Sequence, residues 1–351
     1  MIFHSALRIL DANLNRAREA LRVMEEHARF VLDDASLTES VKQARHALAA
    51  AVPPDLAAAA LRHRDIVSDV GRQISTPTEF QRSDELAVAV AAGKRLSEAL
   101  RAIEEYAKPV SLDVARAIEQ IRYEGYELER RIAIVAGARE RLARLRLYVI
   151  ITESLCKGDW FATARATLEG GADVIQLREK GLTDRELLNR GKRLSSLCRD
   201  HGALFIVNDR ADIAAVCGAD GAHLGQDNLP VTAARKILPD RAIVGVSTHT
   251  VAQAREAIDA APDYVAVGPM FATSTKPQEH VAGPSTLADV RRLTGIPLVA
   301  IGGIGTETAD AVVGAAPCIV CVCTAVIARD DPKQAARRLR ESIERAGTLR
   351  T

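Results

Sequence analysis

Polar and cationic residues follow an apolar run in the stretch YVAVGPMFATSTK, residues 264–276. The run YVAV is apolar or small and leads into Gly268, whereas the following segment supplies three hydroxyls and a cation: Thr273, Ser274, Thr275 and Lys276. Hydroxyls and backbone N–H groups donate hydrogen bonds, and a lysine neutralises negative charge. We therefore expect a buried strand that ends in an anion-binding loop.

Other apolar runs of the C-terminal part also end in polar residues. These are Gln176, Arg178, Glu179 and Lys180 at the end of the second run, Asn208 and Asp209 at the third, Asp227 and Asn228 at the fourth, Ser247 at the fifth, and Thr324 at the eighth. Gln176 and Arg178 share a parity, so their side chains would point into a barrel together. Polar residues end most strands, but this set combines several cations with Asp209, an acid that could bind metal. Together they suit a charged phosphate ester bound with Mg²⁺.

The glycine turn Gly302-Gly303-Ile304-Gly305 follows the seventh apolar run. Glycine lets backbone N–H groups approach a phosphate, and we expect a helix to begin at Thr306, directly after the turn. In barrels of parallel strands, phosphate sites lie after strands seven and eight. The residues therefore imply two phosphorylated ligands, a pyrophosphate with metal and a monophosphate.

Eight short apolar runs alternate with helical patterns from Leu147 onward. They cover residues 147–152, 173–178, 204–209, 221–225, 243–247, 264–268, 298–303 and 319–324. Strands that are apolar on both faces and separated by helices indicate a parallel sheet. Eight such units over residues 147–348 predict an α/β fold, a (β/α)8 TIM barrel, with the active site at the C-terminal ends of the strands. A doubly wound sheet is the alternative, but the eighth unit favours closure.

Residues 1–136 show helical periodicity throughout, which predicts an all-helical domain. Asp11 or Asn13 could cap a first helix that runs to Leu32, and a second helix is expected over residues 37–51. Further helices are expected from about Asp84 and after Pro109 to about Ala136. The charged segment 137–146, GARERLARLR, is predicted to be a helical linker to the barrel.

An internal repeat lies in the helical part, where RAREALRVMEEHAR at residues 16–29 recurs as RLSEALRAIEEYAK at residues 95–108. Helical spacing puts charged residues of each copy on one face: Glu19, Arg22 and Glu26, then Glu98, Arg101 and Glu105. These could be solvated helices laced by Arg–Glu pairs, which the spacing favours. The alternative is a pseudo-two-fold site of carboxylates and arginines for Mg²⁺ and phosphates.

The composition narrows the class of protein. The 351 residues are 48% hydrophobic but only 3% aromatic, and the formal net charge of +1 gives no support for a nucleic-acid partner. The N-terminus MIFHSALRIL lacks a signal-peptide pattern, and no apolar run reaches membrane-spanning length. We expect a cytoplasmic enzyme that acts on small phosphorylated molecules and does not bind a membrane. Barrels of this size often associate, which leaves a homo-oligomer open.

Three cysteines, Cys318, Cys321 and Cys323, lie in the apolar stretch APCIVCVCTAVI. They could be interpreted as part of a metal site, but no second pair or His-x-His set completes one. We interpret them as small hydrophobic residues of a strand.

The barrel sequence resembles the thiamine-phosphate synthase family over residues 145–345. The matching motifs are QLREK (176–180), VNDR (207–210), ADGAHLGQ (219–226), GVSTH (245–249), YVAVGPMFATSTK (264–276) and LVAIGGI (298–304). The resemblance implies a transferase that joins 4-amino-2-methyl-5-hydroxymethylpyrimidine pyrophosphate to a (carboxy)thiazole phosphate and releases pyrophosphate. A barrel that only isomerises a thiazole phosphate is the alternative, but it would not need the cations of the pyrophosphate site.

The resemblance also implies a role for each site residue. Gln176 to Lys180, Asn208, Ser247 and Lys276 would hold the pyrimidine pyrophosphate, and Asp209 would bind Mg²⁺. Thr273 to Thr275, Gly303 and the backbone of Cys323 and Thr324 would hold the thiazole phosphate. The implied mechanism is dissociative, with Arg178, Lys180 and Lys276 neutralising the leaving pyrophosphate.

One position departs from the family pattern. The family has a second Mg²⁺-binding acid two residues after Gln226, where this chain has Asn228, and its acid lies one residue earlier at Asp227. An Asn carbonyl can bind Mg²⁺ but brings no charge. Either Asn228 serves, or a shifted loop lets Asp227 serve, and we expect weaker Mg²⁺ affinity than in the family.

The helical part resembles a domain found fused ahead of thiamine-phosphate synthases. The resemblance lies in ILDANLNRAREALRVMEEHARF, in HRDIVSDVG and in the second copy EALRAIEEYAK. It implies an alternative kinase for hydroxymethylpyrimidine phosphate, which would use ATP and Mg²⁺. Candidate residues are Glu19, Arg22, Glu26, Asp65, Asp69 and Arg101. A non-catalytic helical module for dimerisation or docking is the other hypothesis.

Overall fold

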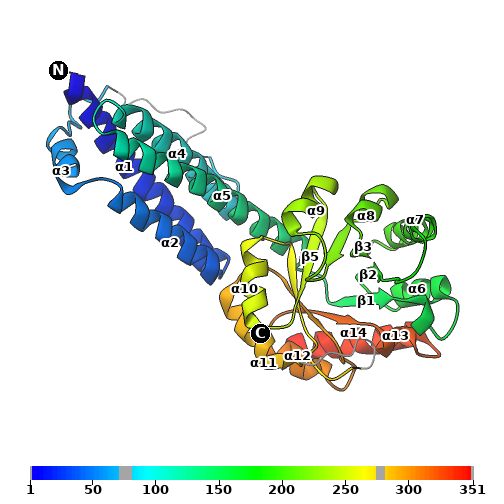
Figure 1. The fold of residues 1–351 in the computed structure, drawn as a ribbon. Coiled ribbons are helices and arrows are strands. Elements are labelled where there is room, and N and C mark those ends of the chain that lie inside the picture. The colour runs from blue at the N-terminus through cyan, green and yellow to red at the C-terminus, as the bar shows by residue number, and fades with distance from the viewer. Residues whose placement is uncertain (1, 71–80, 274–280, 349–351) are drawn as a thin grey trace. The chain divides into compact units, whose positions relative to one another are not determined.

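The computed structural model describes residues 2–70, 81–273 and 281–348, and the chain forms two compact units, residues 1–136 and 137–351 (Figure 1). The first unit is helical, as predicted. Its elements are α1 (Ile2–Glu26), a π-helical turn (His27–Val31), α2 (Ala35–Ala50), α3 (Pro54–Arg62), α4 (Glu85–Ala107) and α5 (Leu112–Leu142).

Local chemistry explains most of these helix ends. Asp34 and Asp84 cap α2 and α4, because each carboxylate accepts a hydrogen bond from the third following backbone N–H. The predicted cap at Asp11 or Asn13 is wrong, because α1 begins at Ile2 and the amide of Asn13 instead donates to the carbonyl of Ile9. Helix α5 extends to Leu142, so residues 137–142 of the predicted linker continue this helix.

The second unit is a closed barrel of eight parallel strands in sequence order. The strands are β1 (Leu147–Ile151), β2 (Val174–Leu177), β3 (Leu204–Asn208), β4 (Gly221–Leu224), β5 (Ile243–Thr248), β6 (Tyr264–Val267), β7 (Leu298–Ile301) and β8 (Ile319–Val322). Each lies within its predicted apolar run or extends one residue beyond it. The predicted barrel is therefore confirmed, and the doubly wound alternative is wrong.

Helices connect the strands and lie outside the barrel (Figure 1). They are a 3-10 turn (Glu153–Leu155), α6 (Trp160–Glu169), α7 (Asp184–Asp200), α8 (Ala211–Cys217), α9 (Val231–Ile237), α10 (Val251–Asp259), α11 (Gly283–Leu293), α12 (Ala309–Ala315), α13 (Thr324–Ile327) and α14 (Pro332–Thr348). Thr183 and Glu186 form a capping box that starts α7.

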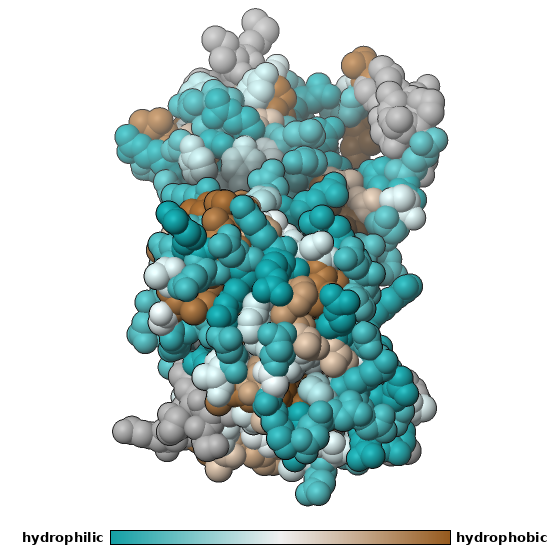
Figure 2. Space-filling model, turned by 90° about the vertical axis from the view of Figure 1, so that its right-hand side faces the viewer, coloured by the Kyte–Doolittle hydropathy of each residue, from teal (hydrophilic) through white to brown (hydrophobic). Residues whose placement is uncertain are grey.

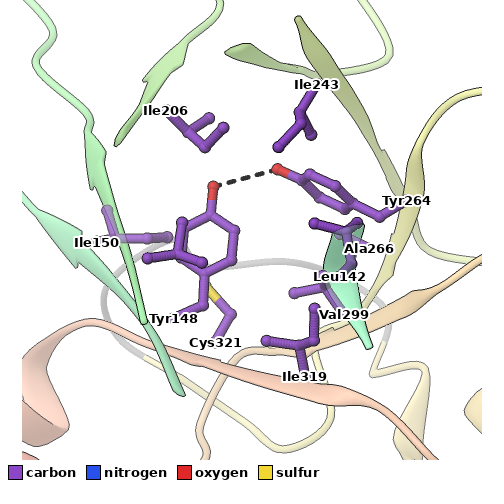
Figure 3. Close-up of a cluster of buried hydrophobic side chains, with 11 residues drawn as sticks. Leu142, Tyr148, Ile150, Ile206, Ile243, Tyr264, Ala266, Val299, Ile319 and Cys321 are labelled. Carbon is purple, nitrogen blue, oxygen red and sulfur yellow. Dashed lines mark hydrogen bonds between the residues drawn. The ribbon is translucent and has the colours of Figure 1, made fainter. Parts of the chain in front are cut away.

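The barrel interior is filled by inward-pointing side chains, most of them apolar. Figure 3 shows part of this core, in which Ile150, Ile206, Ile243 and Val299 surround two tyrosines, Tyr148 and Tyr264. Cys321 is buried in the same cluster, which agrees with its interpretation as a hydrophobic residue. The low aromatic content of the chain thus includes two large residues at the centre of the barrel.

Three aspartates satisfy backbone N–H groups at the end of the barrel where the strands begin. Asp173, Asp220 and Asp263 directly precede β2, β4 and β6, and their Oδ2 atoms accept from N–H groups of β1, β3 and β5 at 2.7–2.9 Å. The carboxylate of Asp263 also pairs with Arg141 and with Arg235. These carboxylates hold neighbouring strands together at the end opposite the predicted active site.

The face of the molecule drawn in Figure 2 is mainly polar. Figure 2 shows one face of the molecule, on which hydrophilic side chains predominate and hydrophobic ones occupy smaller areas between them. In the ranges that the structure describes, none of the helices combines the length and apolarity that crossing a bilayer demands.

Replacing Asp263 by Ala should lower the free energy of unfolding of the barrel by about 3 kcal/mol, because it removes the carboxylate that partners two guanidinium groups and a buried N–H. Asp289→Ala is the matched control, since Asp289 pairs with Arg292 on the surface, and it should cost less than about 1 kcal/mol. Urea unfolding followed by the fluorescence of Trp160, the one tryptophan of the chain and part of α6, would measure both. Equal losses for the two variants would contradict the role of Asp263.

Candidate active site

Two adjacent cavities open at the C-terminal ends of the strands. The larger has a volume of about 590 Å³ and lies around the ends of β7 and β8. Its walls come from the turn after β7, from the start of α13 and from the loop after β6. Residues that line it include Arg178, Thr273, Gly302, Gly303, Gly305, Cys323, Thr324 and Arg329.

The smaller cavity has a volume of about 140 Å³ and lies around the ends of β2 to β6. It is more polar in character, since most of its lining side chains can donate or accept hydrogen bonds. Residues that line it include Gln176, Arg178, Lys180, Asn208, Asp209, His223, Ser247, His249 and Thr273. Most of the residues predicted to bind a pyrophosphate therefore meet at one cavity.

Arg178 lines both cavities, together with Ile150, Thr273, Ile301 and Gly302. The backbone of Arg178 is fixed, because its N–H donates to the carbonyl of Ile151 and its carbonyl accepts from the hydroxyl of Thr152. Its guanidinium can bind an oxyanion through several parallel N–H groups. One cation thus serves as a wall between two places where anions could bind.

Asp209 follows β3 in a left-handed backbone conformation with a φ of 65°. This conformation is uncommon for a residue other than glycine, and here the N–H of Asp209 donates to the carbonyl of His223 at 2.8 Å. Asp209 lines the smaller cavity, as do Asn208 and the cations Arg178 and Lys180. A single carboxylate combined with phosphate oxygens of a substrate is a common way to hold Mg²⁺.

Within residues 2–70, 81–273 and 281–348, no cluster of three or more His, Cys, Asp or Glu side chains is placed to hold a metal ion. The predicted second ligand, Asn228, uses its Oδ1 to accept a hydrogen bond from the N–H of Gly225. Asp227 is exposed to solvent on the same turn. Of the predicted Mg²⁺ ligands, Asp209 thus lines the smaller cavity. Its carboxylate oxygens are of the type that Mg²⁺ prefers.

The turn after β7 depends on glycine at position 303. Gly303 has a φ of 68°, and a Cβ there would lie 2.8 Å from atoms of Phe271. The helix predicted to begin at Thr306 begins instead at Ala309, because the Thr308 hydroxyl accepts from the N–H of Gly305 and closes a turn first. The turn therefore supplies backbone to the larger cavity before any helix starts.

Cys323 contributes a neutral wall to the larger cavity. Burial raises the pKa of its thiol to about 11, although the nearby Arg178 acts in the opposite direction. The thiol therefore stays protonated at neutral pH and does not compete with an anionic ligand for that cation. The expectation that the backbone of Cys323 and Thr324 serves the site is compatible with this geometry.

His249 and His223 both line the smaller cavity and are both held by hydrogen bonds. The Nδ1 atom of His249 lies 2.6 Å from the carbonyl oxygen of Gly268, and because a carbonyl only accepts, this nitrogen carries the proton. His223 is buried and contacts the hydroxyls of Tyr264 and Ser247 through its two ring nitrogens. Neither ring is a loosely held group on the rim.

Some predicted residues are not brought to either cavity in the described structure. Leu177 is buried in the barrel wall. Glu179 accepts from the backbone N–H of Glu153 and pairs with Arg190, and its pKa is raised mainly because its side chain is buried. Both stabilise the end of β2. The predicted residues Ser274, Thr275 and Lys276 lie outside the described residues.

Sequence reasoning missed part of the lining. Ile150 and Ile301 supply apolar walls shared by the two cavities, and Arg329 adds a cation to the larger one. The missed signal for the isoleucines was parity, since Ile301 is the last residue of β7 and Ile150 the last but one of β1, and both line the cavities. For Arg329 the signal was its place after the eighth strand and its short helix.

The repeat in the helical unit forms two clusters of charges, each around a buried carboxylate. In the second copy, Glu104 is buried and accepts from Arg101 at 2.7 Å and from Arg122 at 2.8 Å. In the first copy, Glu25 occupies the equivalent place, 3.7 Å from Arg22 and 3.1 Å from Arg45. The repeat thus places one buried carboxylate between arginines in each half.

The charged residues singled out from the sequence lie beside these buried carboxylates rather than at the same positions. Arg22 forms an exposed pair with Glu26 at 3.0 Å, and Arg101 forms one with Glu105 at 2.9 Å, so the solvated Arg–Glu interpretation describes these pairs. Glu19 is exposed. The exposed loop after α3 contains Asp69 and Asp65, whose carboxylate accepts from Ser68.

Comparison with known proteins supports this division of the chain. Residues 147–326 match the family described as thiamine monophosphate synthase, and residues 8–131 match the ThiD2 family. The barrel is similar to a solved thiamine phosphate pyrophosphorylase from Pyrococcus furiosus, with 36% identity, a TM-score of 0.54, and coverage of 57% of this chain and 96% of that one.

Similar proteins extend over both units. A thiamine-phosphate synthase from Rhodopirellula baltica is 39% identical, covering 97% of this chain and 93% of its own length. A thiamine-phosphate synthase from a Synechocystis species is also 39% identical, covering 96% of each chain. The order of helical unit and barrel is therefore shared with these relatives.

Replacing Glu104 by Gln should lower the free energy of unfolding of the helical unit by about 3 kcal/mol, because Arg122 would lose its buried charged partner. The neighbouring Glu105→Gln is a matched control, since Glu105 also pairs with Arg101 but is exposed, and it should cost less than about 1 kcal/mol. Thermal unfolding followed by circular dichroism at 222 nm would compare them. A loss for Glu105→Gln as large as that for Glu104→Gln would refute a special role for the buried carboxylate.

Proposed function

The chain belongs to the thiamine-phosphate synthase family and is a transferase of thiamine biosynthesis, and we propose how its two cavities divide the reaction. The enzyme condenses 4-amino-2-methyl-5-hydroxymethylpyrimidine pyrophosphate with a thiazole phosphate, giving thiamine phosphate and pyrophosphate. The smaller cavity receives the pyrimidine pyrophosphate, and the larger cavity receives the thiazole phosphate. The observation that carries this proposal is the position of Arg178 in the walls of both cavities.

The polar residues of the smaller cavity suit a dissociative departure of pyrophosphate. Arg178 and Lys180, with Lys276 as the third cation that we propose, hold the leaving group and balance the negative charge that it gains as the C–O bond breaks. Gln176, Asn208 and Ser247 supply hydrogen bonds that orient the substrate. Asp209 would hold Mg²⁺, which supplies further charge neutralisation at the pyrophosphate.

The larger cavity suits a monophosphate and a small ring. Thr273 and the backbone at Gly303, Cys323 and Thr324 would hold the phosphate, and Ser274 and Thr275 are the further hydroxyl residues that we propose for this role. Because the cavities share a wall, a thiazole anchored by its phosphate in one would lie next to a pyrimidine bound in the other. Alignment of two bound substrates contributes much of the rate when no general base is needed.

The isomerase alternative fits the site less well than the transferase. A barrel that only isomerised a thiazole phosphate would not need Lys180, Asn208 and Asp209, which line the smaller cavity. Mg²⁺ as cofactor and a cytoplasmic location remain part of this proposal, which is compatible with a monomer as well as with a homo-oligomer.

For the helical unit we propose a second activity, the phosphorylation of hydroxymethylpyrimidine phosphate by ATP. It is supported by the match of residues 8–131 to the ThiD2 family and by the paired carboxylates and arginines of the repeat. The exposed residues Arg22, Glu26 and Arg101 lie beside the buried carboxylates. The two arginines are the candidates for contact with phosphates, and Glu26 is a candidate for binding Mg²⁺. A helical module without chemistry is the competing proposal.

Arg178→Ala should lower kcat about 100-fold and raise KM for both substrates, because Arg178 belongs to both cavities and neutralises the leaving group. Arg329→Ala is the matched control, since Arg329 lines the larger cavity and does not belong to the described lining of the smaller one. This variant should raise KM for the thiazole phosphate alone. Steady-state kinetics with each substrate varied in turn would measure this. A change in only one KM for Arg178→Ala, with kcat unchanged, would contradict the shared role.

The full chain should form thiamine phosphate from hydroxymethylpyrimidine monophosphate, ATP, Mg²⁺ and thiazole phosphate without a separate kinase. The Lys180→Ala chain, supplied with the same mixture, should accumulate the pyrimidine pyrophosphate, because its barrel is impaired while its helical unit is intact. Chromatography of the products would follow both. If thiamine phosphate forms only when the pyrimidine pyrophosphate is supplied as substrate, the barrel proposal stands and the helical unit has no kinase activity.

A further inference from the structure

Five polar side chains form a continuous line of hydrogen bonds through the barrel interior. It begins at Gln176 on β2, whose Nε2 donates to the hydroxyl of Tyr148 at 2.6 Å. The hydroxyls of Tyr148 and Tyr264 are 3.1 Å apart (Figure 3). The hydroxyl of Tyr264 is 2.9 Å from Nδ1 of His223, and Nε2 of His223 is 2.8 Å from the hydroxyl of Ser247. We call these five residues the relay.

Both ends of the relay lie at the smaller cavity, while its middle lies in the apolar core. Gln176, His223 and Ser247 line the cavity, whereas Tyr148 and Tyr264 belong to the buried cluster. Burial raises the pKa of both tyrosines above the ordinary value, so each remains a neutral phenol with one proton. A buried hydroxyl in apolar surroundings is costly unless its hydrogen bonds are made.

The sequence makes room for the relay at Gly245. Strand register pairs His223 with Gly245 and Gly245 with Tyr264, so these three residues lie side by side on β4, β5 and β6. The ring of Tyr264 passes over Gly245 and stacks on the imidazole of His223, with centroids 5.7 Å apart and planes 15° apart. A Cβ at position 245 would lie 1.9 Å from Cζ of Tyr264, so only glycine allows this placement.

The donors and acceptors of the relay can be arranged in one direction. The Nε2 of Gln176 only donates, so Tyr148 accepts there. The buried proton of Tyr148 needs an acceptor, and the arrangement that supplies one has Tyr148 donate to the hydroxyl of Tyr264. Tyr264 then gives its own proton to Nδ1 of His223, which leaves the imidazole proton on Nε2. That N–H donates to the oxygen of Ser247. The hydroxyl proton of Ser247 is thereby left to point elsewhere.

We infer that Tyr148, Tyr264 and His223 are positioning residues that make Ser247 a hydrogen-bond donor to an anionic oxygen in the smaller cavity. This inference rests on the proposed function, in which that oxygen belongs to the pyrimidine pyrophosphate. A Ser hydroxyl can donate or accept a hydrogen bond, and an anionic oxygen binds it favourably only when the hydroxyl donates. The relay selects that orientation before substrate binds, which reduces the cost of ordering the site.

The inference predicts that removing one hydroxyl from the core changes substrate binding at the cavity. In Tyr264→Phe, Nδ1 of His223 loses its donor, and the imidazole is free to place its proton on Nδ1. Its Nε2 then accepts from Ser247, so the serine proton is no longer available to substrate. We expect KM for the pyrimidine pyrophosphate to rise about tenfold, the size of one hydrogen bond to a charged group, with a smaller effect on KM for the thiazole phosphate.

A double-mutant cycle tests whether Tyr264 acts through Ser247. Kinetics would be measured for full-length wild type, Tyr264→Phe, Ser247→Ala and the double variant. In the Ser247→Ala background, Tyr264→Phe should change KM less than twofold. Thr248→Val is the matched control, because it removes a buried hydroxyl from the same strand, one that donates to the carbonyl of Ala266, and it should leave KM near wild type. Full additivity, or equal effects of Tyr264→Phe and Thr248→Val, would overturn the inference.

A second readout does not depend on activity. Nitrogen-15 NMR of histidine-labelled full-length protein reports the tautomer of each ring, and the His223→Gln chain assigns the signals of His223. We expect a protonated Nε2 and an unprotonated Nδ1 in wild type, and a changed pattern in Tyr264→Phe but not in Thr248→Val. A protonated Nδ1 in wild type would overturn the inference. If wild type made no thiamine phosphate from its two substrates, the proposed function would fail while this tautomer test would still decide the state of the relay.

Discussion

The barrel depends on satisfying backbone N–H groups at the end where its strands begin. Hydrogen bonds between parallel strands leave such groups without a strand partner, and an exposed end invites fraying. Asp173, Asp220 and Asp263 each stand one residue before a strand and accept from the strand preceding it in the chain. With this end held by carboxylates, the opposite end can carry loops chosen for chemistry, such as the glycine turn at Gly303.

The polar relay in the core shows how such a scaffold differs from a simple apolar filling. Tyr148 and Tyr264 could be replaced by phenylalanines of almost the same shape, and an apolar interior would then need no hydrogen bonds. Their hydroxyls instead connect Gln176 to His223, which contacts Ser247, and all three of these residues line the smaller cavity. A buried polar network in which every member finds a partner rigidifies its surroundings and specifies one arrangement. The side chains of the smaller cavity are therefore held in place by hydrogen bonds from the barrel core as well as by apolar packing.

Much of this architecture could be predicted from the sequence, since the eight strands and most of their polar ends follow from apolar runs and parity. Local signals failed where tertiary contacts decide. Helix α3 was missed because Pro53 and Pro54 suggest an end, although Pro54 stands in the first turn of a new helix. Glu104 was overlooked beside Glu105, because spacing along one helix does not reveal that Arg122 of α5 covers only one of them. The relay was invisible for the same reason, as it joins five strands.

The close approach of Tyr264 to Gly245 has a consequence for how this sequence can diverge. A side chain at position 245 and a large ring at position 264 exclude each other, because they would occupy the same volume. A lineage could exchange the glycine only after the tyrosine had already become small. Substitutions at positions 245 and 264 are therefore coupled, because the glycine on β5 is required as long as β6 carries a large ring.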